Sequence, residues 1–204
     1  METILLDWKL ILGYAISHLL LYFTFDNPKV FWYILTGSTL FLISYAVINE
    51  DLDDTLPVIR YLPIGIVSGI LLYLLIWAGY EALQRLGIHF LSVGVLHLYE
   101  GYAPKILWHY ILLVLVIVPG EEIFWRGFIL KRISSQTDAS LSLVLASLLY
   151  AFAYAWSGVF VLVLAAAICG LFWGYLYFRW RSLPLSVISH LTFDILLFVF
   201  FPLI

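Results

Sequence analysis

The sequence predicts an all-α membrane protein, a polytopic bundle of about seven or eight transmembrane helices around a central cavity. Its 204 residues are 64% hydrophobic and only 11% charged, with a mean hydropathy of +1.06. An ordinary soluble domain is about 45–50% apolar and about 25% charged. A soluble core of this length would not bury so much apolar surface, and apolar stretches long enough to span a bilayer recur along the whole chain.

Seven apolar stretches, separated by short polar breaks, are long enough to cross a membrane. Residues 86–104, between the third and the fourth stretch, are rich in glycine and histidine, so we expect an interfacial or re-entrant segment there rather than a full span. The expected spans are residues 8–25, 30–48, 60–82, 105–130, 140–157, 159–178 and 184–202. Together they form a single membrane domain, residues 1–204.

The distribution of basic residues predicts the orientation, because cytoplasmic loops of membrane proteins carry an excess of Lys and Arg. The pattern favours a cytoplasmic N-terminus in a multi-pass protein of the plasma membrane. The N-terminal side carries Lys9, Arg60, Lys131, Arg132, Arg179 and Arg181, whereas the opposite side carries Lys29, Arg85 and Lys105. A net charge of −3 without a basic patch excludes nucleic acid as a partner, and the lipid bilayer is the partner that the composition implies.

Two further patterns, an acidic run and regularly spaced small residues, are interpreted as structural features. The acidic run at residues 50–54 lacks the spacing of a calcium loop, and we interpret it as a solvated surface loop. Small residues spaced by four allow helix backbones to approach closely, and we expect a packing role for them. They are Gly65 and Gly69, and Ala166, Gly170 and Gly174.

The most informative motif lies in the fourth span, where Glu121, Glu122 and Arg126 interrupt an apolar run. Charged side chains are costly inside a membrane and mark functional sites there. Glu122 and Arg126 are four residues apart, in the order that favours an ion pair along one helix face. Adjacent residues project about 100° apart, so we expect Glu121 to be left free to face a cavity, where a carboxylate suits a general base. The alternative is a purely structural ionic cluster.

A second polar constellation lies in the last span. His190 and Asp194 are four residues apart and therefore share one helix face. A carboxylate beside an imidazole fixes the tautomer of the ring and stabilises its protonated form. A packed histidine is the structural alternative, but the in-register aspartate favours a functional pair.

Taken together, these motifs resemble the CPBP (Abi) family of intramembrane endopeptidases, which includes type II CAAX prenyl proteases and bacteriocin-processing or immunity proteins. The resemblance starts from Glu121-Glu122-x-x-x-Arg126 and the last-helix pair His190 and Asp194. It also includes the segments at residues 146–154 and 169–174, with Ser189 preceding the histidine. Residues 105–204 would then be the catalytic core, and residues 1–104 the variable N-terminal helices.

The resemblance implies hydrolysis of a peptide bond in a membrane-anchored peptide or protein, either of the prenylated CAAX type or bacteriocin-like. In the family the first glutamate activates a water molecule, which assigns that role to Glu121, with Glu122 and Arg126 as the supporting pair. A histidine from a Phe-x-x-x-His motif assists it. His190 and Asp194 would help to bind a metal ion or to stabilise the oxyanion.

The middle motif departs from the family pattern, because Tyr150 stands at its first position and Tyr154 replaces the histidine. A phenol is a poor base at neutral pH and is not a usual zinc ligand, although it can donate a hydrogen bond to an oxyanion. A divalent metal such as zinc would then have Glu121, His190 and Asp194 as its ligands. Without a metal, Glu121 and His190 would form a slower general-base site.

The sequence is compatible with three functions. The first is a membrane-embedded endopeptidase, and the second is a pseudoprotease of the same fold that uses its cavity to bind or scaffold a partner, for which Tyr154 is the evidence. The third is a small transporter in which Glu121, His190 and Asp194 relay protons. The chain shows no sign of the paired inverted repeats of many transporters.

Overall fold

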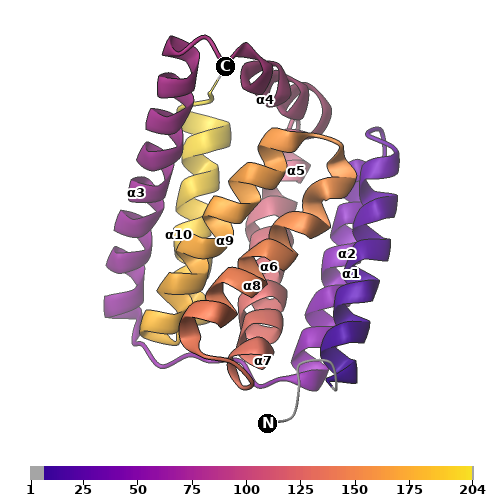
Figure 1. Cartoon of the computed structure of the whole chain (residues 1–204), viewed down its shortest axis with the longest axis vertical. Coiled ribbons are helices and arrows are strands. Elements are labelled where there is room, and N and C mark those ends of the chain that lie inside the picture. Colours follow the sequence, from indigo (N-terminus) through magenta and orange to yellow (C-terminus); the bar gives the residue numbers. More distant parts are fainter. Residues whose placement is uncertain (1–6, 204) are drawn as a thin grey trace.

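A computed structural model describes residues 7–203 of the chain, and this part is helical (Figure 1). Seven of its helical stretches are long and apolar enough to cross a membrane, which confirms the predicted polytopic bundle. The first three are α1 (Trp8–Asp26), α2 (Phe31–Asn49) and α3 (Val58–Arg85). The fourth is continuous from Leu107 to Ser134. The fifth span consists of α8 (Ala139–Ala153) and the 3-10 turn η4 (Tyr154–Ser157), and the sixth is α9 (Phe160–Trp180). The seventh consists of α10 (Leu183–Ile195) and the π-helical turn η5 (Leu196–Phe200).

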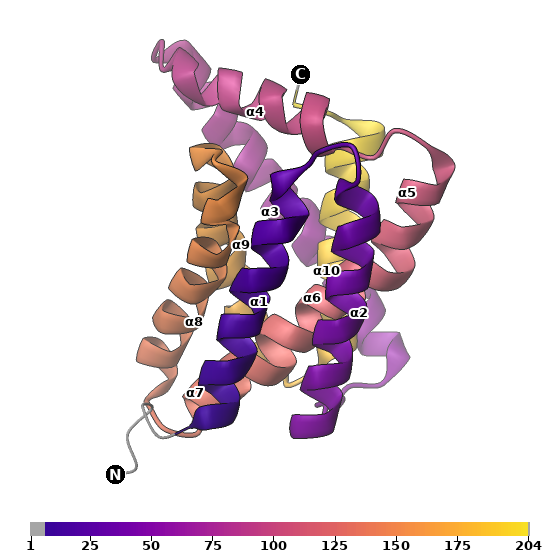
Figure 2. The same cartoon turned by 90° about the vertical axis from the view of Figure 1, so that its right-hand side faces the viewer.

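The segment at residues 86–104 is not a span, as the sequence predicted. It contains α4 (His89–Tyr102), 14 residues or about 21 Å of helix, too short for a hydrocarbon core of about 30 Å. Figures 1 and 2 show α4 lying across the bundle at the end where the chain terminates, with the N-terminus at the other end.

The fourth span has an irregular backbone around the glutamate pair. It runs through α5 (Leu107–Leu112), the π-helical stretch η2 (Leu113–Ile117), α6 (Val118–Glu122), the π-helical stretch η3 (Ile123–Leu130) and α7 (Lys131–Ser134). Wider π-helical turns inside α-helices often occur at functional sites. Here two of them flank α6, and a third, η5, begins two residues after Asp194.

Glycines bring the helices that carry the site close together. A Cβ atom on Gly69 would lie 2.4 Å from the carbonyl oxygen of Ser189, so α3 and α10 approach at this point as only a glycine permits. A Cβ on Gly120 would lie 2.2 Å from Cγ2 of Thr39, which fixes α6 against α2 in the same way. The packing role predicted for the spaced small residues is confirmed at Gly69 and also at Gly170, which lies against Ser147 of α8.

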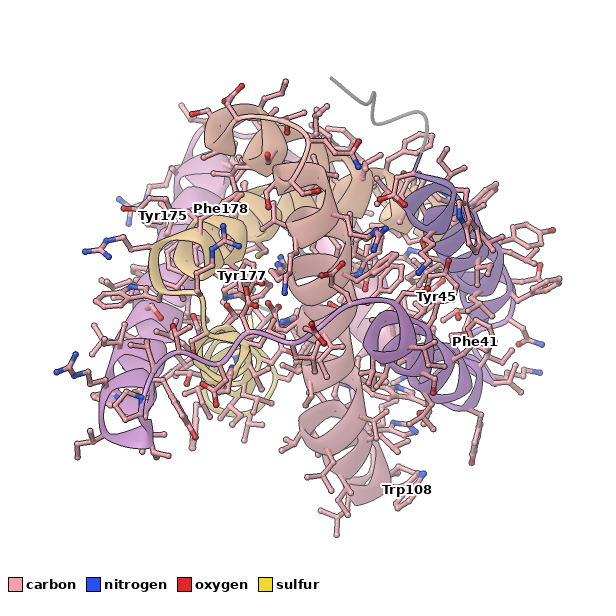
Figure 3. The ribbon with its side chains drawn as sticks, turned by 90° about the horizontal axis from the view of Figure 1, so that it is seen from below. Phe41, Tyr45, Trp108, Tyr175, Tyr177 and Phe178 are labelled. Atoms are coloured by element: carbon pink, nitrogen blue, oxygen red, sulfur yellow. The ribbon has the colours of Figure 1, made fainter. Side chains whose placement is uncertain are left out.

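An ionic belt closes the N-terminal end of the bundle, the end that Figure 3 shows from below. The Arg132 guanidinium donates to both carboxylate oxygens of Asp7, at 2.7 and 3.0 Å, and to Glu50 at 3.0 Å. Lys131 pairs with Asp53 at 2.8 Å. The acidic run is therefore a surface loop, as predicted. Its side chains are not all simply solvated, however, because the Glu50 and Asp53 carboxylates bind Arg132 and Lys131 of the fourth span.

Candidate active site

The interior of the bundle contains a cavity of about 620 Å³ with mostly apolar walls. Its lining comes from all seven spans and from α4. Five of its lining residues carry the polar side chains that matter for chemistry. They are Glu121 of α6, Tyr150 of α8, Tyr154 of η4, and His190 and Asp194 of α10.

Two tyrosine hydroxyls hold the Glu121 carboxylate. Tyr150 donates to Oε2 at 2.8 Å, and Tyr154 donates a short hydrogen bond to Oε1. The two tyrosines are four residues apart and share one face at the end of α8, so both hydroxyls reach the same carboxylate. An ionised carboxylate accepts about four hydrogen bonds, so each oxygen of Glu121 keeps room for one more partner.

Glu122 is fully buried and has partners other than the tyrosines. Its Oε1 accepts a hydrogen bond from Nη1 of Arg126 at 3.1 Å, which confirms the predicted ion pair. The same oxygen lies 2.8 Å from Nδ1 of His190. Because a carboxylate only accepts, the imidazole donates Nδ1–H and its Nε2 faces Asp194.

The His190 ring is held by a stacking partner as well as through its nitrogen atoms. It stacks on the Trp173 indole with a centroid distance of 3.7 Å, and its Nε2 lies 3.7 Å from Oδ2 of Asp194. The indole nitrogen of Trp173 donates to the hydroxyl of Ser189, which in turn accepts from Ser68 of α3. The imidazole is thus held by three helices.

Arg126 connects the two halves of the site. Besides its ion pair with Glu122, its guanidinium lies 4.7 Å from the ring centroid of Tyr150 and 5.3 Å from that of Trp173. Such cation–π contacts stabilise a buried guanidinium. Arg126 therefore pairs with Glu122 and also packs against Tyr150, a hydrogen-bond partner of Glu121.

The structure brings together all six residues singled out in the sequence, with two changes. Glu121 faces the cavity as expected, but it is not free, since both of its oxygens accept tyrosine hydroxyls. His190 bonds to Glu122, a link that the sequence did not suggest. The other span histidines lie elsewhere: His109 stacks on Trp32, and His18 accepts a hydrogen bond from Trp156.

Sequence reasoning missed the contribution of Tyr150, which it treated as a mild replacement for phenylalanine. The signal that identifies it is its spacing of four from Tyr154, which places a second hydroxyl on the face that carries the first.

The described residues do not fit a three-ligand metal site. Among the side chains that the structure describes, no group of three or more His, Cys, Asp or Glu residues is arranged to hold an ion. The Nδ1 of His190 is directed at Glu122, and each oxygen of Glu121 already accepts a tyrosine hydroxyl.

Comparison with protein families places this part of the chain in a known family. Residues 101–196 match the family model described as type II CAAX prenyl endopeptidase Rce1-like. The chain carries an Rce1-like domain. All six singled-out residues and Tyr150 lie in this Rce1-like domain, which confirms the resemblance to the CPBP family. No curated protein and no solved structure matches the chain.

Proposed function

We propose that the protein is an intramembrane endopeptidase that hydrolyses a peptide bond in a membrane-anchored substrate, with Glu121 activating the water. The observation that carries the proposal is the Glu121 carboxylate in the wall of a mostly apolar cavity, held there by Tyr150 and Tyr154. The Rce1-like domain supports it, because that family consists of peptide-cleaving membrane enzymes.

The chemistry needs one proton acceptor and one group that stabilises negative charge. A water molecule bound to a free acceptor position of Glu121 transfers a proton to the carboxylate as its oxygen attacks the peptide carbonyl. The protonated Glu121 then gives this proton to the leaving amine. When His190 is protonated, its Nδ1–H stays on Glu122, and its Nε2–H, which lies 3.7 Å from Asp194 and forms no close hydrogen bond to it, donates to the developing oxyanion.

The nature of the walls favours a substrate that is itself membrane-embedded. Apolar side chains line nearly all of the cavity. Such a cavity should bind a peptide segment next to an apolar anchor more readily than it binds a hydrophilic peptide. A prenylated CAAX-type protein and a bacteriocin-like peptide both meet this condition. We propose that the enzyme resides in the plasma membrane with its N-terminus in the cytoplasm, because the ionic belt gathers the basic residues at that end.

The decisive experiment is cleavage of a membrane-anchored reporter peptide by the purified protein. We expect wild-type protein to cleave it and Glu121→Gln to lose cleavage. Because Gln keeps the size of the side chain and can still accept the tyrosine hydrogen bonds, the variant separates chemistry from folding.

A pseudoprotease is the second candidate, and Tyr154 favours it. The phenol occupies an oxygen of Glu121 where the family places a histidine, and a phenol does not assist proton removal from water. Wild-type protein without activity, together with cleavage by Tyr154→His, would establish this function. Proton-coupled uptake into liposomes would instead establish the transporter.

A further inference from the structure

We propose that a second, small cavity next to Glu121 is a water-binding site that supplies the water consumed in hydrolysis. The small cavity lies between α1, α2 and the fourth span, and its lining includes Ser38 and Thr39 of α2, Glu121 and Phe124 of the fourth span, and Tyr154. Figure 2 shows α1 and α2 side by side, with α6 behind them. The inference rests on the proposed function and adds the place where its second substrate, water, is bound.

The small cavity adjoins the large apolar cavity at the proposed general base. Glu121, Tyr154 and Leu35 line both cavities, so these three side chains form the boundary between them. An apolar substrate segment that fills the large cavity displaces water from it. A water molecule in the small cavity would remain beside the Glu121 carboxylate while the substrate is bound.

The size of the small cavity fits one water molecule. Its volume is about 20 Å³, and a buried water molecule needs about 10–15 Å³ together with two to four polar partners. A peptide or a lipid chain would not fit into this volume. Hydroxyl groups of Ser38 and Thr39 and the Glu121 carboxylate provide the polar partners.

Thr39 differs from the other threonines of the described spans in its hydrogen bonding. The hydroxyls of Thr24, Thr36 and Thr192 each donate to the carbonyl oxygen four residues earlier, at 2.7 or 2.8 Å. Thr39 is only 5% exposed, yet within the described part of the chain its hydroxyl bonds to no protein group. Buried hydroxyls normally have a partner. A water molecule in the small cavity would accept the hydrogen bond from Thr39.

Ser38 provides a second partner for the same water molecule. It is 4% exposed, and its hydroxyl lies 3.4 Å from the hydroxyl of Thr24. Because Thr24 donates its own hydrogen to the carbonyl oxygen of Leu20, Ser38 is the donor in this pair and keeps its lone pairs free. The water therefore accepts from Thr39 and donates to Ser38 and Glu121, which gives the three hydrogen bonds typical of a buried water.

The position of this water accounts for every atom that hydrolysis adds. The water crosses the boundary at Glu121, where the carboxylate takes one of its protons, and its oxygen bonds to the peptide carbon in the large cavity. The C–N bond of the peptide then breaks, and Glu121 passes the proton to the leaving amine. The water thus supplies the hydroxyl of the new carboxyl group and one hydrogen of the new amine.

The first test compares Thr39→Val with Thr36→Val. Valine has the shape of threonine without the hydroxyl, and Thr36 is a matched control on the same helix, because it lines neither cavity. With the membrane-anchored reporter, we expect Thr39→Val to lower kcat about three- to tenfold, the effect of one lost hydrogen bond, and to leave KM nearly unchanged. Thr36→Val should have the kcat of the wild type.

The thermal unfolding temperature separates this role from a structural one. Thr39→Val removes no hydrogen bond within the protein, so its unfolding temperature should not fall below that of Thr36→Val, which loses the bond to Trp32. Equal kcat values for the two variants would overturn the water site. A higher KM with an unchanged kcat would also overturn it, because it would place Thr39 in substrate binding.

Radiolytic hydroxyl-radical labelling detects the bound water without any cleavage, because an X-ray pulse converts a bound water into a radical that oxidises the side chains around it. Phe124 and Phe128 are both 0% exposed, but only Phe124 lines the small cavity. We expect wild-type protein to be labelled several-fold faster at Phe124 than at Phe128, and Thr39→Val to lose this excess. Such an excess in a wild type that cleaves nothing would support the water site and refute only the proposed function. Equal labelling of the two phenylalanines in the wild type would refute the water site.

Discussion

The Tyr150 hydroxyl donates a hydrogen bond to Oε2 of Glu121 at 2.8 Å, across the packing between α8 and the fourth span. Tyr154 binds the other oxygen of the same carboxylate. The carboxylate that we propose as the general base is therefore oriented by two neutral donors, in place of the single histidine of the family motif.

Removal of either hydroxyl should slow cleavage by loosening this carboxylate. A hydrogen bond to a charged group contributes about 1.5–3 kcal/mol, so Tyr150→Phe and Tyr154→Phe should each lower kcat by about 10- to 100-fold, with a small change in KM. Tyr45→Phe is the control, because the Tyr45 hydroxyl bonds to the backbone of Lys9, away from the cavity. An unchanged kcat in both site variants would show that the hydrogen bonds do not position the base.

The buried ion pair predicts a stability effect that is separate from catalysis. Glu122 and Arg126 are 0% and 2% exposed, and removal of one partner leaves a buried charge, which costs about 3–5 kcal/mol. Arg126→Met should therefore lower the thermal unfolding temperature in detergent strongly, whereas Arg85→Met, at an exposed position, should not. In the double variant with Glu122→Gln the losses should be less than additive, and strict additivity would contradict the pairing.

The sequence predicted the spans and the Glu122–Arg126 pair because both depend on local spacing. Hydropathy gives the length of a span, and a separation of four gives a shared helix face. The bond between His190 and Glu122 joins residues 68 positions apart and depends on how α10 packs on α6, which no local pattern encodes.

Close helix packing leads to a prediction for Gly69. Because its added Cβ would meet the Ser189 carbonyl at 2.4 Å, Gly69→Ala should force α3 away from α10 and destabilise the protein by about 1–3 kcal/mol, the usual cost of overpacking. Gly101→Ala, where an added Cβ meets nothing within 4 Å, is the matched control. Thermal unfolding of both variants measures the difference. Equal unfolding temperatures would mean that the two helices move apart without cost.

The donor geometry predicts that a metal ion is not required for activity. His190 and Glu121 are occupied by hydrogen bonds within the protein, and the described residues form no three-ligand cluster. Cleavage of the anchored reporter should therefore persist after dialysis against a strong chelator, and elemental analysis should find much less than one zinc per chain. Loss of activity on chelation and its recovery with zinc would instead support Glu121, His190 and Asp194 as ligands.

The ionic belt predicts how stability depends on pH. Burial raises the pKa of the Asp53 carboxyl, but hydrogen bonds from Lys131 and Tyr177 and the charges of Lys131 and Arg181 outweigh it and hold the pKa below its ordinary value of 3.8. A lowered pKa in the folded state means that ionised Asp53 stabilises the fold at pH values above 3.8 and that this contribution is lost as the pH falls through the folded-state pKa.

The unfolding temperature of the wild type should therefore drop on acidification below pH 3.8, and Asp53→Asn, which does not titrate, should show a smaller drop over the same range. Asp51→Asn is the control, because the side chain of this exposed neighbour forms none of the ion pairs of the belt. Identical acid profiles for the wild type and Asp53→Asn would show that the belt does not contribute to stability through this carboxylate.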